Sequence, residues 1–423
     1  MSGRTFHIET LGCPKNQVDS DKLVVTLLAD GLTPARTAAE ADLVVVNTCA
    51  FVEEARQESV DVILALSDAK KAGARVVVTG CMAERYGAEL AEALPEVDRV
   101  AGFGVPVTLS AARRAGPDLR GRDDQPVPSL DLLNLPRPAS TSPWAYVKVA
   151  EGCDRACGFC AIPSFRGPQR SRTVESILRE VDELQAREIV LVAQDLASFG
   201  RDQGQGQRAI VPLVRAVAER VDRTRLLYLY PSDLTDALVD AICETGVPYF
   251  DLSLQHVSRP LLRRMKRWGD GERFLERIAD IRNREPAAAF RSNFIVGYPG
   301  ETEDDHDELL RFVEAAQLDW CGFFTFSEEA GTLAATQGGK VDASLARERH
   351  LELTELQDRI TAERRAALVG DTVEVLVDEP GVGRTHREAP EIDGIVHVPD
   401  TLPVGTFHTL TVKTAEGPDV TAG

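Results

Sequence analysis

The chain has 423 residues and a formal net charge of −19 at pH 7. That length predicts two to three domains, and no apolar run approaches the ~18 residues that a membrane span requires. Such a charge disfavours non-specific binding to nucleic acid, which depends on Lys and Arg neutralising phosphates, and it favours a basic partner or no macromolecular partner.

The opening segment, Met1–Glu9, lacks the apolar core of a secretory signal, so we expect a cytoplasmic protein. Disulfides are rare in that compartment. The eight cysteines are therefore more plausible as ligands than as disulfide partners, except that Cys243 and Cys321, which have no cysteine nearby in the sequence, are interpreted as core residues.

The first ~135 residues alternate apolar runs with helical patterns. Strands are predicted at Phe6–Thr10, Leu43–Thr48 and Val76–Thr79, with helices at Ser20–Ala29 and Glu53–Ala72. Near-continuous β-branched runs between helices are typical of a doubly wound parallel sheet. In such sheets ligands bind outside the carboxyl ends of the strands.

A cysteine follows each of these three runs: Cys13, Cys49 and Cys81. They are far apart in sequence and converge only if the sheet forms as predicted. One interpretation is an iron–sulfur cluster held by three thiolates with one open iron. The other is that they are small buried hydrophobic residues, as free cysteines often are. We favour ligands, because three cysteines occupy equivalent strand ends.

A segment rich in Pro, Gly and charged residues, Gly104–Ser142, has the composition of a linker. We place a domain boundary there, with domains at 1–135, 140–342 and 369–423 and a connecting helix at 343–368. Strand and helix patterns alternate again from residue 145, and they suit an incomplete parallel (β/α)6 barrel. The predicted strands are Ala145–Ala150, Glu188–Ala193, Arg225–Tyr230, Phe250–Gln255, Phe290–Gly297 and Cys321–Phe326.

The loop after the first of these strands places Cys153, Cys157 and Cys160 in a C-x3-C-x2-C spacing. Thiolates that close can hold an iron–sulfur cluster. A cubane has four iron corners and this loop supplies three sulfurs, so one iron would stay open to a small molecule. Zinc and a disulfide framework are the alternatives, but structural zinc takes four ligands and no fourth Cys or His lies nearby in the sequence.

Barrel enzymes carry their chemistry on the loops after the strands. The candidate cofactor-binding residues there are Gln194, Asp195, Gln255, Arg291 and Gly297. Each polar one has the alternative of a satisfied rim or core group. Gly297 would let the backbone approach a ligand closely.

Thr302 and Asp305 can cap the helix that follows Gly297. Arg166, Arg170 and Arg172 follow the cysteine loop and could offset the charge of a cluster, cofactor or substrate. We favour the alternative, a solvated helix start, for these three arginines.

The last segment, Gly370–Gly423, has short alternating runs with Pro-Gly and Asp-Gly turns, which predict a small antiparallel β-barrel. It contains three basic and ten acidic residues, a net charge of −7. A barrel of that sign repels phosphate and attracts a cationic protein.

The loop C-x3-C-Gly-Phe-C resembles that of the radical S-adenosylmethionine enzymes, with Phe159 directly before the third cysteine. The resemblance implies that S-adenosylmethionine binds the open iron and is cleaved to a 5′-deoxyadenosyl radical. Leu11-Gly-Cys-Pro-Lys-Asn16, Asn47-Thr-Cys49 and Gly80-Cys81 resemble the N-terminal domain of methylthiotransferases, and the last barrel resembles their TRAM domain.

Within that family, Pro-Lys-Asn16 and Gln255-His-Val-Ser258 resemble the RimO branch more than the MiaB branch, which acts on transfer RNA. The resemblance implies two [4Fe-4S] clusters, S-adenosylmethionine, a low-potential electron donor and an aspartate of the small-subunit ribosomal protein S-twelve, modified at its β-carbon. The two clusters are expected to face one another. The alternatives are a transfer-RNA methylthiotransferase, a non-catalytic two-cluster electron carrier and a zinc-stabilised adaptor.

Overall fold

The computed structural model describes residues 4–107, 131–204 and 209–423. They divide into two compact units. The first contains the N-terminal domain together with residues 150–154 and 161–172, and the second contains residues 139–149, 155–160 and the rest of the chain. The most polar part of the expected linker, 122–128, lies outside the described residues.

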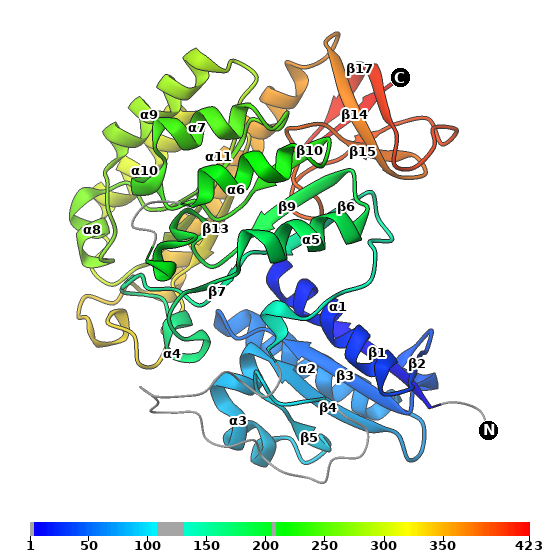
Figure 1. Ribbon diagram of the computed structural model, residues 1–423. Coiled ribbons are helices and arrows are strands. Elements are labelled where there is room, and N and C mark those ends of the chain that lie inside the picture. The colour runs from blue at the N-terminus through cyan, green and yellow to red at the C-terminus, as the bar shows by residue number, and fades with distance from the viewer. Residues whose placement is uncertain (1–3, 108–130, 205–208) are drawn as a thin grey trace. The chain divides into compact units, whose positions relative to one another are not determined.

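The first unit is built on a five-stranded sheet in the order β2-β1-β3-β4-β5, in which every pair is parallel (Figure 1). Its elements are β1 (Thr5–Thr10), α1 (Pro14–Ala29), β2 (Thr33–Pro34), β3 (Leu43–Thr48), α2 (Glu53–Ala69), β4 (Arg75–Gly80), α3 (Cys81–Ala93) and β5 (Arg99–Val100).

Alternate residues of the strands face two separate cores. Leu23 and Leu27 of α1 pack with Val45 on one face. Ile63 of α2 and Met82 of α3 pack on the other face. Helices therefore cover both sides of a parallel sheet, which confirms the predicted doubly wound fold.

The second unit contains six strands that pair in parallel, in two groups of three. A bridge between Leu229 and Leu252 joins the groups, so the strands follow one another in chain order as in an incomplete barrel. This confirms the predicted (β/α)6 fold. The strands are β6 (Trp144–Lys148), β9 (Glu188–Val192), β10 (Arg223–Leu226), β11 (Tyr249–Gln255), β12 (Ala289–Val296) and β13 (Trp320–Thr325).

Helices connect these strands. They are α5 (Val174–Leu184), α6 (Ile210–Ala218), α7 (Asp236–Cys243), α8 (Arg259–Arg264), α9 (Gly271–Arg284) and α10 (Glu303–Ala316). The short helix α4 (Ile162–Arg166) and the pair β7 (Ala150–Glu151) and β8 (Arg170–Ser171) follow β6 but belong to the first unit. Thr302 and Asp305 form the expected capping box at the start of α10.

The chain ends in a long helix and a small closed barrel, coloured orange to red in Figure 1. The helix is α11 (Ala343–Ala366), and the strands are β14 (Thr372–Glu379), β15 (Val382–Arg384), β16 (Val396–His397), β17 (Phe407–Glu416) and β18 (Asp419–Ala422). The barrel is confirmed, but it is not wholly antiparallel. β16 and β18 pair in parallel. The chain runs from β16 to β17 and then forms β18, which lies between those two strands.

Buried ion pairs join the small barrel to the amino ends of the central strands. Glu188 of β9 accepts from Arg225 at 2.8 Å and pairs with Arg384 of the small barrel at 3.2 Å. Several of the ten C-terminal acids are used internally in this way, among them Asp378 and Glu388. Within the described residues, no helix is long and apolar enough to cross a bilayer.

Candidate active site

Three strand ends of the first unit bring Cys13, Cys49 and Cys81 to one edge of the sheet. Cys13 follows β1 and is the N-cap of α1, Cys49 follows β3, and Cys81 is the first residue of α3 after β4. β3 lies between β1 and β4, and the strands run in register to their last residues. The parallel sheet therefore gathers cysteines that are far apart in the sequence.

The turn before Cys13 is packed tightly against Cys49. Gly12 has a φ of +95°, and a Cβ added there would lie 2.7 Å from the Cβ and 2.9 Å from the Sγ of Cys49. Only glycine fits this turn. A substitution at this position would displace one candidate ligand or the other.

Asn16, the last residue of the Leu11–Asn16 motif, ties this edge together. Its amide donates to the carbonyl oxygens of Leu11 at 2.8 Å and Thr48 at 3.0 Å, the residue directly after β1 and the last residue of β3. Its backbone carbonyl accepts from Asn47 at 2.8 Å. The Asn16 side chain is fully buried. An Asn is needed at this position of the motif because its amide supplies hydrogen bonds to buried backbone groups that would otherwise lack partners.

Arg166, at the end of α4, reaches the same edge. Its guanidinium donates to the Sγ of Cys81 at 2.9 Å and to the Oδ1 of Asn16 at 3.0 Å. It also pairs with Glu151 at 2.7 Å and is 9% exposed. The expected solvated helix start is therefore wrong for Arg166. Arg170 is partly exposed and pairs with Asp131 at 2.8 Å, but it lies in β8 rather than at a helix start, and Arg172 is buried.

The three thiols share one electrostatic environment. Burial, with the nearby Cys81 and Cys13 sulfurs, raises the pKa of the Cys49 thiol to about 12. Burial also raises the pKa of Cys81, although Arg166 opposes this. Burial acts in the same direction on Cys13, but Lys15, Arg166 and the backbone N–H groups of the first turn of α1 lower its pKa.

This donor set fits an anionic iron–sulfur cluster. All eight cysteines are free thiols, and cations and a helix N-terminus surround the strand-end set. Within the described part of the chain, no three His, Cys, Asp or Glu side chains converge closely enough to hold a single metal ion.

The second cysteine set lies on the loop after β6 and β7. The N–H of Cys160 donates to the carbonyl of Cys157 at 3.2 Å, which curls the loop. Gly158 donates to the carbonyl of Met265 at 2.7 Å and accepts from Ala334 at 2.8 Å. Arg267 donates to the Sγ of Cys157 at 3.4 Å. These contacts hold the loop and place a cation against one sulfur, which fits a bound cluster.

Arg155, inside the cysteine loop, is held by two carboxylates. It donates to Asp195 at 2.5 Å and also to Asp233, while Ser198 donates to the same oxygen of Asp195 at 2.5 Å. The other oxygen of Asp195, Oδ1, is buried and has no hydrogen-bond partner among the described residues. A buried acceptor without a partner is costly, so this atom fits a donor supplied by a bound molecule.

Tyr230 lies between two guanidinium groups. The guanidinium carbons of Arg155 and Arg267 are each 3.9 Å from the centre of its ring. Both distances suit cation–π attraction. The ring thus links the cysteine loop to the segment after β11.

The other candidate residues lie in different settings. Gln194 follows β9 and Gln255 ends β11, both at the carboxyl ends of central strands and both partly exposed. Phe159 is half-buried in the cysteine loop. Whether these side chains touch a cofactor stays a prediction.

Two candidates have structural partners instead. Arg291 is the third residue of β12, near the amino end, and pairs with Asp251 at 3.2 Å and Asp393 at 3.3 Å. We interpret it as part of the contact with the small barrel. Gly297 has a φ of +75°, and a Cβ there would lie 2.7 Å from that of Ala346 in α11. Packing against a helix explains this glycine without a ligand.

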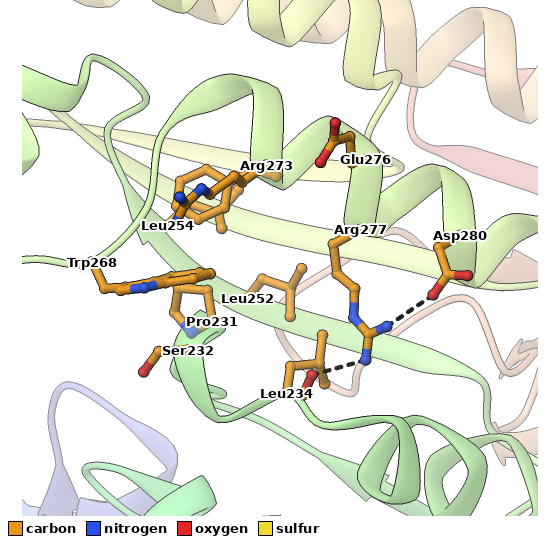
Figure 2. A pocket seen from close by; sticks show the side chains of 11 residues that line it. Pro231, Ser232, Leu234, Leu252, Leu254, Trp268, Arg273, Glu276, Arg277 and Asp280 are labelled. Carbon is orange, nitrogen blue, oxygen red and sulfur yellow. Dashed lines mark hydrogen bonds and ion pairs between the residues drawn. The ribbon is translucent and has the colours of Figure 1, made fainter.

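A cavity of about 370 Å³ opens beside the carboxyl ends of β10 and β11. Figure 2 shows Trp268 alongside Pro231 at one side, and Arg277 between the Leu234 carbonyl and Asp280 at the other. Leu252 and Leu254 form its apolar floor.

Sequence reasoning missed the residues that surround the cysteine loop, namely Arg155, Ser198, Tyr230, Asp233 and Arg267. The position of Arg155 between two cysteines was a usable signal. The others come from three separate segments, after β9, β10 and α8, and no local pattern marks them.

Comparison with known families agrees with this architecture. Residues 147–313 match the family described as the radical SAM superfamily, and residues 369–423 match the TRAM domain. Residues 5–102 match a family described as uncharacterized protein family UPF0004. The fold and the cysteine loop thus define a radical S-adenosylmethionine enzyme.

The curated relatives are more specific. The "Ribosomal protein uS12 methylthiotransferase RimO" of Nocardioides sp. is 42% identical over 98% of this chain and 95% of its own length. The protein of that name from Saccharopolyspora erythraea is 43% identical over 99% and 95%. The chain therefore belongs to the RimO family of radical S-adenosylmethionine methylthiotransferases.

A solved structure supports the fold. The radical S-adenosylmethionine methyltransferase TsrM from Kitasatospora setae, with cobalamin and a [4Fe-4S] cluster bound, has a TM-score of 0.51 and 16% identity. The match covers 90% of this chain and 80% of that one. At this identity the likeness concerns the fold alone.

Proposed function

We propose that this methylthiotransferase replaces a hydrogen on the β-carbon of an aspartate in ribosomal protein uS12 with a methylthio group. The observation that carries the proposal is the second set of thiols. An enzyme that only generates a radical needs the loop at Cys153, Cys157 and Cys160, and the strand-end set of Cys13, Cys49 and Cys81 provides a separate place for sulfur.

Each set would hold a [4Fe-4S] cluster that lacks one protein ligand. When bound, these groups would supply a sulfur at the strand-end site and, at the loop, the electron that cleaves S-adenosylmethionine to a hydrogen-abstracting 5′-deoxyadenosyl radical. The chain's own residues position and shield these groups. Arg166 and Arg267 donate to ligand sulfurs, and N–H donors of this kind offset thiolate charge.

S-adenosylmethionine would bind over the carboxyl ends of the central strands. The unpartnered Oδ1 of Asp195 is suited to accept from its amino or hydroxyl groups, with Gln194, Gln255 and Phe159 at the rim. Arg291 and Gly297 are left out, for the reasons given above. The buried barrel interior keeps water from a radical.

The substrate and partners follow from charge and from the relatives. All the relatives described above carry the name of an enzyme that acts on uS12. An acidic chain suits a basic ribosomal protein in the cytoplasm better than it suits RNA. A low-potential electron donor is also required. A transfer-RNA substrate remains the alternative.

The test is anaerobic reconstitution with iron and sulfide, followed by reaction with S-adenosylmethionine, a reductant and either uS12 or transfer RNA. Mass analysis should show uS12 heavier by CH2S at one aspartate, and unmodified RNA. Modified RNA with unmodified uS12 would refute the proposed substrate.

A further inference from the structure

A strongly basic segment interrupts this acidic chain directly after β11. Residues 259–267 include five cationic side chains and no acidic one, whereas the whole chain carries −19. The cationic residues are Arg259, Arg263, Arg264, Lys266 and Arg267. We call residues 259–267 the basic segment.

Four of the five cations of this segment are exposed, and Arg267 is partly buried. Leu261, Leu262 and Met265 are buried and anchor the segment. Arg259, Arg263 and Lys266 are exposed, and none of them forms an ion pair within the described parts of the chain.

Arg264 donates to the backbone carbonyls of Pro299 at 3.0 Å and Gly338 at 3.1 Å, and it pairs with no carboxylate of the residues that the structure describes. The segment therefore presents uncompensated positive charge. Such charge speeds encounter with an acidic partner.

The same segment touches the cysteine loop. The carbonyl of Met265 accepts from Gly158, and Arg267 donates to the Sγ of Cys157 at 3.4 Å. The exposed Lys266 is thus the sequence neighbour of a residue that contacts a candidate cluster ligand. Electron transfer weakens steeply with distance, so a carrier bound here would be well placed to reduce that cluster.

An exposed aromatic residue completes the surface. Trp268 follows the basic segment, is 44% exposed and forms one wall of the cavity in Figure 2. Aromatic and Arg side chains are enriched where proteins dock. Redox encounters bury little area, so a small basic rim around one aromatic residue is sufficient.

We propose that the basic segment and Trp268 form the docking surface for the electron donor, a small acidic one-electron carrier protein. This rests on the proposed function, which requires such a donor. One electron passes from the reduced carrier to the cluster held by Cys153, Cys157 and Cys160. The carrier leaves oxidised, no covalent bond forms or breaks, and no proton moves.

The test uses the reconstituted full chain and a plant-type [2Fe–2S] ferredoxin, reduced beforehand, as the probe. Stopped-flow spectroscopy follows ferredoxin oxidation for wild type and for the double variant Arg263→Glu/Lys266→Glu. We expect the second-order rate constant to fall by about tenfold or more at low salt, with a smaller difference at high salt. Reduction of the same variant by dithionite should match wild type, because a small reductant needs no docking surface.

The matched control is Arg179→Glu/Lys413→Glu, two exposed cations on α5 and β17 with the same change of charge. It should keep the wild-type ferredoxin rate. An equal loss in both double variants would mean that only total charge matters and would overturn the proposal.

A second result would also overturn the proposal. If Arg263→Glu/Lys266→Glu keeps the wild-type ferredoxin rate but no longer binds a ribosomal RNA fragment, the surface binds phosphate rather than a carrier protein. The uS12 assay with dithionite tests the proposed function separately. If uS12 is not modified but the ferredoxin rate still falls in Arg263→Glu/Lys266→Glu, the proposed substrate is wrong and the proposed docking surface is supported.

Discussion

The guanidinium of Arg166 is buried among groups of both signs at the strand-end site. It donates to Cys81 and Asn16, pairs with Glu151 and packs over the ring of Phe103, 4.6 Å from its centre. A buried cation with this many partners is costly to remove, because it leaves other charges unpaired. Its position next to a candidate ligand sulfur would also favour the more negative state of a bound cluster.

Replacing Arg166 with Gln should make the strand-end cluster harder to reduce. Loss of a charged hydrogen bond of 1.5–3 kcal/mol corresponds to a shift on the order of 60–130 mV towards negative potential. A redox titration followed by electron paramagnetic resonance measures it. Arg166→Lys, which keeps the charge, should recover part of the shift.

Arg170→Gln is the matched control for this prediction, because Arg170 forms an exposed pair with Asp131. The reduction potential of the strand-end cluster in Arg170→Gln should equal that of wild type. A potential that does not move in Arg166→Gln would show that Arg166 only supports the fold.

Substitutions in the two cysteine sets should affect different activities. Cys157→Ala should abolish 5′-deoxyadenosine formation, whereas Cys49→Ala should preserve it and stop sulfur transfer to uS12. Chromatography of the nucleoside and mass analysis of uS12 measure the two outcomes. If Cys49→Ala still modifies uS12, the strand-end thiols do not serve sulfur transfer.

At the scale of elements, most strand ends were predicted to within two residues, because buried parallel strands have a strong sequence signal. The strand predicted at Arg225–Tyr230 is the exception, because β10 is Arg223–Leu226 and the chain leaves the sheet before Tyr230. Helix starts were predicted less well. α1 begins at Pro14 rather than Ser20, since Pro is favoured in the first turn of a helix. The sharp start of α3 at Cys81 depends on Gly80, whose φ is +91°. These starts set the positions of two cysteines.

The contact between the small barrel and the central barrel contains a half-buried histidine. The Nε2 of His386 lies 2.9 Å from the carbonyl oxygen of Ala287, and burial, reinforced by Arg387, lowers its pKa to about 4. Glu388 opposes this shift, and Arg225 adds to it. A histidine with a lowered folded-state pKa stabilises the fold above its unfolded pKa and loses that contribution as pH falls.

Lowering the pH from 7 to 5 should therefore cost about 1–2 kcal/mol of unfolding free energy through His386 alone, because the unfolded histidine takes up a proton that the folded one does not. Urea unfolding at both pH values measures the difference. His386→Gln should show a smaller pH dependence. An equal dependence in this variant would assign it to other groups.

At the scale of the whole molecule, counting charges overstated the acidity of the small barrel. The C-terminal segment has a net charge of −7, but Glu388 is buried against Arg365, and Asp393 is buried beside Tyr249 and Arg291. The sequence does not reveal which acids are used internally. The same limit hid the loops that surround Cys157, because their contacts form only in the folded barrel.

Exposed acids remain on the small barrel, including Glu379 and Glu416. Reversing both to Lys should weaken binding of uS12 several-fold at low salt and less at high salt, because screening reduces surface charge effects. Calorimetry at two salt concentrations measures this. Glu219→Lys/Glu355→Lys, on the central barrel and α11, is the matched control, and equal losses in both pairs would refute a specific role for the small barrel.

The central claim is that two separate cysteine sets each hold a cluster. Iron and acid-labile sulfide in the anaerobically reconstituted chain test this most directly, with wild type compared to a variant in which Cys153, Cys157 and Cys160 are all Ala. The variant should hold half the iron and half the sulfide of wild type. A variant without iron would contradict the claim, because the strand-end thiols would then hold no cluster of their own.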